Sequence, residues 1–235
     1  MDGKSMAFLQ KEAATAVTNC FESGLNLENL LQCAVIQIQF YEAMQLSLVQ
    51  ALPPAQNRAC RSGCAACCRR KIACTIPEAI AIAAWLSDRG EDENQRVRAE
   101  AQHLHDSTAD LDDLGRVRAG LPCPLLVEQQ CSVYEARPIA CRAVYSFDRA
   151  ACDSFFLDHE FQTRIPFYDL MVEAHGQMLL GYGRALDKLG LDGGLVELAS
   201  ALLILLTEPD AIDRYLAGER VFEAAKLGRF RQQPV

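Results

Sequence analysis

The sequence has no long hydrophobic run and no hydrophobic leader. Its longest strongly apolar stretch, residues 198–206, is about half of the roughly 20 residues that a membrane-spanning helix needs. The first residues of the chain lack the apolar run of a secretory signal. We therefore expect a soluble, cytoplasmic protein with no membrane partner.

Positive charge and phosphate-binding motifs are also scarce. The 235 residues include 23 basic and 31 acidic side chains, and the net charge of −8 argues against nucleic acid as a partner. The glycine pairs Gly181-x-Gly183 and Gly193-Gly194 do not follow a strand, so they do not form a dinucleotide-binding fingerprint. No Ser-His-Asp or Cys-His pattern stands out, and no catalytic residue can be named.

Most of the chain has the spacing of apolar residues that is typical of helices. A long helix is expected over residues 27–52, because its apolar positions recur at helical spacing after Asn26 and Pro53-Pro54 ends it. Thr75-Ile76-Pro77-Glu78 has the form of a capping box with a proline in the first turn, and it opens a second helix. Six further helices are expected, over residues 1–22, 91–111, 149–161, 166–189, 195–206 and 209–216.

Only residues 125–134 have the pattern of a hairpin. We predict a mostly α-helical protein, wrapped around a small irregular cysteine-rich metal-binding subdomain with one short β-hairpin. The predicted parts are N-terminal helices (1–57), a cysteine core (58–145) with inserted helices (76–111), and C-terminal helices (146–235). They are expected to pack as one compact domain.

The chain has eleven cysteines, a high and odd number for a cytosolic protein. In a reducing compartment such cysteines are metal ligands or redox groups more often than disulfides. Cysteines three or four residues apart can turn their sulfurs toward one metal. Seven of them fall in two blocks and are the candidate metal ligands: Cys60, Cys64, Cys67, Cys68, Cys123, Cys131 and Cys141.

Seven thiolates exceed the four that one zinc ion or one four-iron cluster takes, and are one short of two such sites. Cys74, an acidic side chain or a histidine, with His175 the first to test, could complete a second site. Alternatively, one site uses four cysteines and the rest serve redox chemistry or packing. The neighbours Cys67 and Cys68 point in different directions, so we expect them not to share a site. The cysteines of helical segments are interpreted as small buried hydrophobic residues: Cys20, Cys33 and Cys152.

Basic residues accompany the cysteines. Between Arg58 and Lys71 there are five basic residues and no acidic one, and Arg137 and Arg142 belong to the second block. Four thiolates around a metal leave a net negative site, which nearby cations would stabilise. We therefore predict that Arg137 and Arg142 contact the cofactor. The alternative is an ordinary basic surface patch.

The whole pattern is C-x3-C-x2-C-C, then C-P, then C-x2-Y-x2-R-P-x2-C-R. Over residues 58–145 it resembles the YkgJ-type cysteine cluster family, and this resemblance implies a zinc- or iron-chelating domain. One branch, the flagellin lysine N-methylases, implies an enzyme that uses S-adenosylmethionine. The first three cysteines also have the triad spacing of radical S-adenosylmethionine enzymes, but the repeated strand–helix units of those barrels are absent.

We predict that the cysteines hold an iron–sulphur cluster, a 4Fe-4S cluster in preference to zinc, for redox, sensing or cluster-dependent chemistry. The number of thiolates, the basic surroundings and the resemblance favour iron, although zinc accepts the same ligands. One alternative is an S-adenosylmethionine-dependent methyltransferase that acts on a protein or peptide. Another is a structural zinc module in a helical interaction protein. The oligomeric state and the identity of any protein partner stay open.

Overall fold

The computed structural model describes residues 3–50, 59–143 and 146–227, and the described part is mostly helical, as predicted. It differs from the prediction in having two small two-stranded sheets instead of one hairpin. Its ten α-helices are α1 (Gly3–Cys20), α2 (Leu27–Gln50), α3 (Ile76–Ser87), α4 (Glu91–Thr108), α5 (Asp113–Arg118), α6 (Ile139–Ala143), α7 (Arg149–Phe156), α8 (Asp169–Lys188), α9 (Leu198–Thr207) and α10 (Ala211–Leu216). The expected division into three parts stays a prediction.

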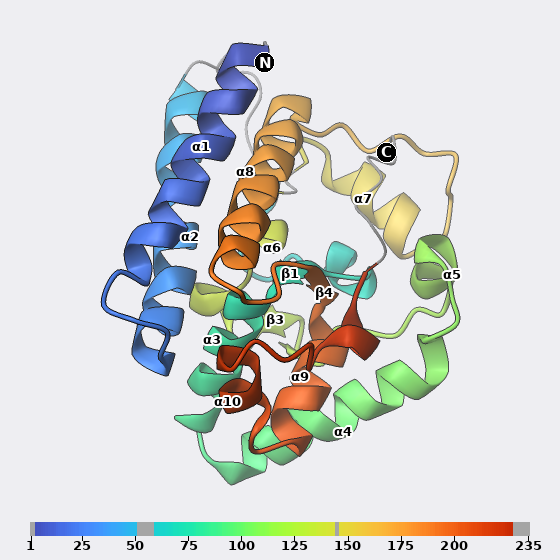
Figure 1. Ribbon diagram of the computed structural model, residues 1–235. Coiled ribbons are helices and arrows are strands. Elements are labelled where there is room, and N and C mark those ends of the chain that lie inside the picture. The colour runs from blue at the N-terminus through green and yellow to red at the C-terminus, as the bar shows by residue number, and fades with distance from the viewer. Residues whose placement is uncertain (1–2, 51–58, 144–145, 228–235) are drawn as a thin grey trace.

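The helices α1, α2 and α8 lie side by side on one flank of the molecule (Figure 1). In α1, Leu9, Ala13 and Val17 recur every four residues and are buried, which gives the helix one apolar face. Gly181 of α8 packs against that face. A Cβ atom added at Gly181 would lie 2.4 Å from the carbonyl oxygen of Gln10, so the two helices are in backbone contact there.

The predicted capping box is confirmed. The Thr75 N–H donates to Glu78 Oε2 (2.8 Å), and the Glu78 N–H donates to the Thr75 hydroxyl (3.4 Å). Glu78 is only 2% exposed, and its other oxygen accepts the N–H of Ile139 (2.7 Å). The carboxylate thereby joins the start of α3 to the start of α6, and α6 carries Cys141.

The helix predicted over residues 195–206 is wrong at its start. Leu195–Glu197 form strand β4, which pairs antiparallel with β1 (Ala73–Thr75) in the register Cys74↔Val196. The α9 helix begins at Leu198, because Glu197 caps it by accepting the N–H of Ser200 (2.8 Å). The pairing joins residues more than a hundred positions apart, and local periodicity contains no signal for such a partner.

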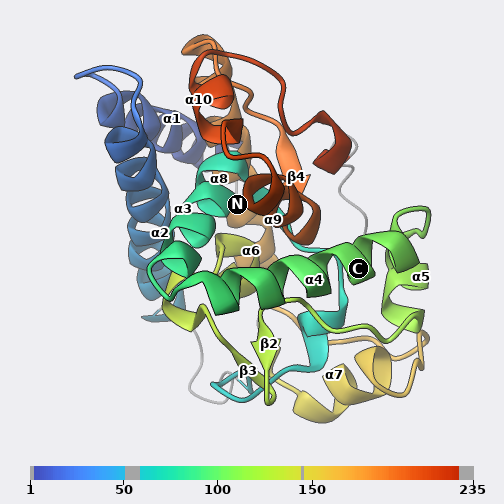
Figure 2. The same cartoon turned by 90° about the horizontal axis from the view of Figure 1, so that it is seen from below.

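The predicted hairpin is confirmed as β2 (Leu126–Val127) and β3 (Gln130–Cys131). Its two turn residues, Glu128 and Gln129, have φ values of 48° and 63°, as a two-residue type I′ turn requires. Pairing of Leu126 with Cys131 brings Cys131 back toward Cys123. The hairpin therefore places two candidate ligands at one end of the molecule (Figure 2).

Other predicted boundaries are changed by a few residues. The solvated helix expected over 91–111 is α4, with a single buried stripe at Val97, Ala101 and Leu104. The helix expected over 149–161 ends at Phe156, and the short α5 was not predicted. Pro53-Pro54 lies outside the described residues.

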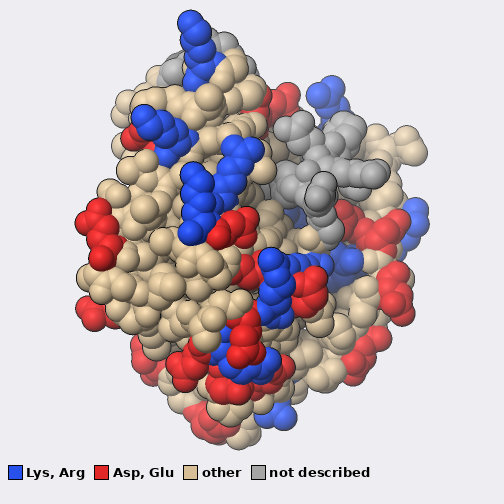
Figure 3. Space-filling view, viewed as in Figure 1, with Lys and Arg blue, Asp and Glu red and all other residues tan. Residues whose placement is uncertain are grey.

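No helix in the described ranges is both long and apolar enough to cross a membrane. On the face seen in Figure 3, basic and acidic side chains lie close to one another between wide areas of uncharged residues. Outside the grey residues, this face has no broad area of positive charge of the kind that binds nucleic acid.

Candidate metal centre

The cysteine-bearing segments meet at one end of the fold. In Figure 2, the segment before β1, the β2–β3 hairpin and α7 lie along the same edge. Cys67 and Cys68 are on the short 3-10 helix η1 (Ala66–Arg69), which packs against α7. No disulfide joins any of the eleven cysteines, all of which the structure describes.

Four cysteines line one small cavity, and we call them the α7 group: Cys60, Cys64, Cys67 and Cys152. The cavity measures about 10 Å³ and is closed by Ala66, Ser146, Phe156 and Phe167. The Ser146 N–H donates to the sulfur of Cys60 (3.4 Å). Burial raises the pKa of Cys152 to about 11, partly opposed by a hydrogen bond with Ser146.

Four other cysteines lie around the hairpin, and we call them the hairpin group: Cys68, Cys123, Cys131 and Cys141. The backbone N–H of Cys123 donates to the carbonyl of Cys68 (2.7 Å), which joins η1 to the start of the hairpin. Burial raises the pKa of Cys123, and the nearby charges of Cys141 and Cys131 raise it further. The thiols of this group therefore lie close enough to interact.

The two groups meet at Cys67 and Cys68. A hydrogen bond between these neighbouring thiols lowers the pKa of Cys67 and raises that of Cys68. Cys67 lines the α7 cavity, whereas the nearby thiol charges that act on Cys68 include those of Cys123 and Cys141. The charge of Cys67 also acts on Cys141, so Cys141 is a neighbour of both adjacent cysteines.

Comparison with known families identifies the segment that contains both groups. A family model named CxxCxxCC, described as a putative zinc- or iron-chelating domain, matches residues 59–163. The match covers 105 of the 235 residues, so it shows what this segment is similar to. The match covers the hairpin, η1 and α7, and includes every member of both groups. No curated protein and no solved structure gives a significant match to the chain.

The segment that matches the CxxCxxCC model has enough thiols to bind zinc or iron, but in the described residues they are not arranged around one point. Each group offers four thiols, the set that tetrahedral zinc or an iron–sulphur cluster takes. Within the described ranges, no three Cys, His, Asp or Glu side chains already converge as metal ligands do. A metal ion bound by either group would therefore require the cysteine side chains to change position.

Three arginines lie beside the hairpin group. The charge of Arg70 acts on Cys141 and that of Arg137 on both Cys131 and Cys141. Arg142 also acts on Cys131, but its buried guanidinium is used in structural contacts: it pairs with Glu42 of α2 and donates to the carbonyls of Arg137 (2.9 Å) and Glu135. Arg137 stacks over the Tyr134 ring, 3.8 Å from its centroid.

The structure places Cys152 differently from the sequence interpretation. Cys152 is buried among apolar residues, as expected, but it also completes the wall of the α7 cavity. Its spacing from the motif carries no signal, because α7 is folded back onto η1 by tertiary packing. Cys74, a candidate for an eighth ligand, is buried in β1 beside the carbonyl of Val196 (3.8 Å), and the charge of Cys141 acts on it. Cys20 interacts with Cys33, away from the motif.

None of the four histidines lines the cavity of the α7 group. His103 and His159 are exposed, and His105 is half-buried on α4. His175 is buried in α8, edge-on to the ring of Tyr41, and its Nε2 atom has no hydrogen-bond partner among the described residues. Burial lowers the pKa of His175 to about 3, and the charge of Arg70 acts in the same direction.

Because burial lowers the pKa of His175, we expect the protein to lose stability in acid. Because its pKa is lower in the folded than in the unfolded state, its neutral form stabilises the fold above pH 6.5, and this contribution is lost as pH falls from 6.5 toward 3. Between pH 7 and pH 5 the loss is about 2 kcal/mol. The free energy of unfolding can be measured with urea at pH 7 and at pH 5. The difference between the two values should be about 2 kcal/mol smaller in His175→Gln than in the wild type. The exposed-site variant His103→Gln should keep the wild-type difference, and an unchanged difference in His175→Gln would contradict the assignment.

Proposed function

We propose that the protein is a metal-binding protein whose hairpin group holds an iron–sulphur cluster of the 4Fe-4S type. Its ligands would be Cys68, Cys123, Cys131 and Cys141. When bound, such a cluster supplies one-electron redox chemistry or a sensor of oxidants. The CxxCxxCC family match supports metal chelation, and the choice of cluster rests on the surroundings of the hairpin group.

The observation that carries the proposal is that four cysteines from separate segments interact with one another around the hairpin, with three arginines beside them. Four thiolates around a metal ion or a four-iron core leave a net negative site, and burial makes uncompensated charge costly. The charges of Arg70, Arg137 and Arg142 act on members of this group. These residues would stabilise the thiolates and tune the reduction potential of the cluster.

The spacing of the hairpin group favours a cluster over a structural zinc ion. Structural zinc sites typically use pairs of ligands separated by about two to four residues. In the hairpin group the two cysteines nearest in sequence, Cys123 and Cys131, are separated by the length of the hairpin. A structural zinc module therefore remains the alternative that the first experiment has to exclude.

The experiment is metal analysis of the full chain, purified without oxygen. Iron, zinc and acid-labile sulfide are measured per chain, together with the absorption spectrum. The expected result is about four irons and about four sulfides, with a brown protein. Zinc without iron or sulfide would overturn the cluster and establish the structural zinc module instead.

The methyltransferase alternative has a test of its own. No contact in the described residues specifically favours S-adenosylmethionine, so this activity stays a prediction from the family resemblance. Calorimetric titration of the anaerobic protein with S-adenosylmethionine decides it: saturable binding at one site per chain supports the alternative. Absence of binding leaves redox or sensing as the proposed role of the cluster.

A further inference from the structure

We propose that Cys20 and Cys33 form a redox-responsive pair, which a peroxide converts into a disulfide that ties α1 to α2. Both cysteines lie outside residues 59–163, the segment that matches the family model. The inference therefore goes beyond metal binding and does not depend on the metal content of the protein. It rests on the contact between the two thiols, on their burial and on the turn that holds them opposite each other.

The two thiols meet across the first pair of helices. Cys20 is the last residue of α1, and Cys33 lies in the second turn of α2. Their side chains are in hydrogen-bond contact, and neither cysteine is in a disulfide in the structure. Two sulfurs in such contact need only a small movement to reach bonding distance, so the disulfide can form without rearrangement of the two helices.

The turn between α1 and α2 fixes this arrangement. Asn26, directly before α2, accepts the N–H of Asn29 at its side-chain oxygen (2.9 Å). The Asn29 amide in turn donates to the Ser23 hydroxyl (2.9 Å) and to the Gly24 carbonyl (2.7 Å). Gly24 has a φ of 119°, a conformation that favours glycine. These contacts hold the end of α1 beside the start of α2.

The two thiols differ in exposure and in acidity. Cys20 is 8% exposed, whereas Cys33 is 0% exposed. The hydrogen bond between them lowers the pKa of Cys20, and the same bond, together with burial, raises the pKa of Cys33. The thiolate is the reactive form of cysteine. Cys20 is therefore the thiol that a peroxide reaches and oxidises first.

The reaction has two steps. The Cys20 thiolate attacks one oxygen of hydrogen peroxide, so that an S–O bond forms, the O–O bond breaks and hydroxide leaves. The Cys33 sulfur then attacks the sulfur of this sulfenic acid: the S–S bond forms, the S–O bond breaks, and the departing hydroxide takes up the proton that Cys33 releases. In sum, both thiols are oxidised to one disulfide, and the peroxide is reduced to water.

The disulfide would join α1 covalently to a helix that is tied into the core. The Gln37 amide donates to the Cys33 sulfur (3.3 Å), and its oxygen accepts the hydroxyl of Thr75 (2.9 Å) in the capping box of α3. Without the disulfide, α1 is held against α2 and α8 by non-covalent packing. A covalent link between the two helices restricts the unfolded chain and thereby stabilises the fold.

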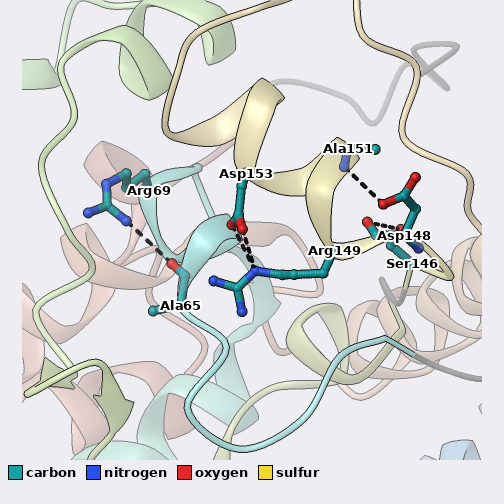
Figure 4. A network of polar contacts seen from close by, with 7 residues as sticks. All are labelled: Ala65, Arg69, Ser146, Asp148, Arg149, Ala151 and Asp153. Atoms are coloured by element: carbon teal, nitrogen blue, oxygen red, sulfur yellow. Dashed lines mark hydrogen bonds and ion pairs between the residues drawn. The ribbon is translucent and has the colours of Figure 1, made fainter.

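The pair lies apart from the α7 group. In Figures 1 and 2, α1 and α2 are on the opposite side of the molecule from α7. Figure 4 shows that the start of α7 is held by contacts of its own: Asp148 accepts the N–H of Ala151 (3.1 Å), and Arg149 donates to Asp153 (2.8 Å). None of these contacts involves α1 or α2. The test must therefore measure the pair separately from the cysteines of the motif.

The sequence makes this separation possible. No lysine or arginine occurs between Lys11 and Arg58, so trypsin releases Cys20 and Cys33 in one peptide, residues 12–58, which has no other cysteine. The full chain, purified without oxygen, is treated with a small excess of hydrogen peroxide, then denatured, alkylated with iodoacetamide and digested. Mass spectrometry should find this peptide with two alkyl groups before oxidation. After oxidation it should carry none and lack two hydrogens, and dithiothreitol should restore both alkyl groups.

Cys74 is the internal control for general oxidation. It is buried, as Cys33 is, and it is the one cysteine of its own tryptic peptide, residues 72–89. Cys74 should be alkylated both before and after the peroxide treatment. Variants test the order of the two steps: dimedone should trap a sulfenic acid at Cys20 in Cys33→Ser, but none at Cys33 in Cys20→Ser.

The decisive measurement uses the wild-type protein, so it does not depend on the folding of a variant. Two alkyl groups on residues 12–58 after peroxide treatment would overturn the proposal. A sulfinic acid at Cys20 without a disulfide, or a disulfide between two chains, would also overturn it, because the thiols would then not pair within the chain. Loss of alkylation at Cys74 as well would show non-specific oxidation and would count against the pair.

Discussion

Replacement of Cys141 by serine is expected to remove the iron and sulfide from the protein almost completely. Cys141 is the thiol on which the charges of Arg70, Arg137, Cys67 and Cys131 act together, and burial raises its pKa to about 12. A metal must therefore displace a proton from this thiol to bind it. Serine, with a far weaker tendency to ionise, would leave three thiolates for a cluster that takes four.

Iron and sulfide should fall from about four of each to less than about one per chain in Cys141→Ser. The apparent stability should fall as well, because the free energy of metal binding is part of the free energy of folding. Cys20→Ser, in α1, should retain the full content. Full iron and sulfide in a folded Cys141→Ser protein would remove Cys141 from the ligand set.

Replacement of Gly181 by alanine is expected to destabilise the fold more than replacement of any other glycine of α8 by alanine. The new Cβ would lie 2.4 Å from the Gln10 carbonyl oxygen and 2.9 Å from Ala13 Cβ, both on α1. Neither contact can be relieved by rotating a flexible side chain, so α1 and α8 would have to move apart. Overpacking of this kind costs about 1–3 kcal/mol, and contact with backbone places this variant at the upper end.

Gly176 offers a matched control in the same helix. A Cβ atom at Gly176 would meet nothing within 4 Å, so Gly176→Ala should stabilise α8 by about 0.5–1 kcal/mol through helix propensity. Urea denaturation of both variants should therefore show changes of opposite sign. Equal effects of the two substitutions would mean that α1 does not pack on α8 as the structure has it.

Several local features were predictable from a few neighbouring residues. Thr75 and Glu78 satisfy each other's backbone N–H groups within one turn, so the capping box needs no distant partner to form. The hairpin of β2 and β3 is fixed by a two-residue turn between apolar residues. The cysteine spacing and its resemblance to a metal-chelating family were equally visible, and the family comparison confirms that resemblance.

Features that depend on distant pairing were not predictable in this way. Residues 195–197 have helical patterning, but they form β4 because the edge of β1 offers backbone partners. Glu78 was expected only as a capping residue. Its second role, holding α6 through the Ile139 N–H, appears only when α3 and α6 meet.

The sequence by itself determined the helical class, the positions of most helices, the hairpin and the identity of the metal-binding segment, because each depends on residues within a few turns of one another. Tertiary structure alone decided how the cysteines are divided. The sequence predicted only that the neighbours Cys67 and Cys68 do not share a site. The structure adds that Cys67 lines a cavity together with Cys152, which comes from a helix outside the spaced motif. Which thiols lie near one another depends on distances in space, not on sequence spacing. The packing of α7 on η1 sets the distance between Cys152 and the cysteines of the motif.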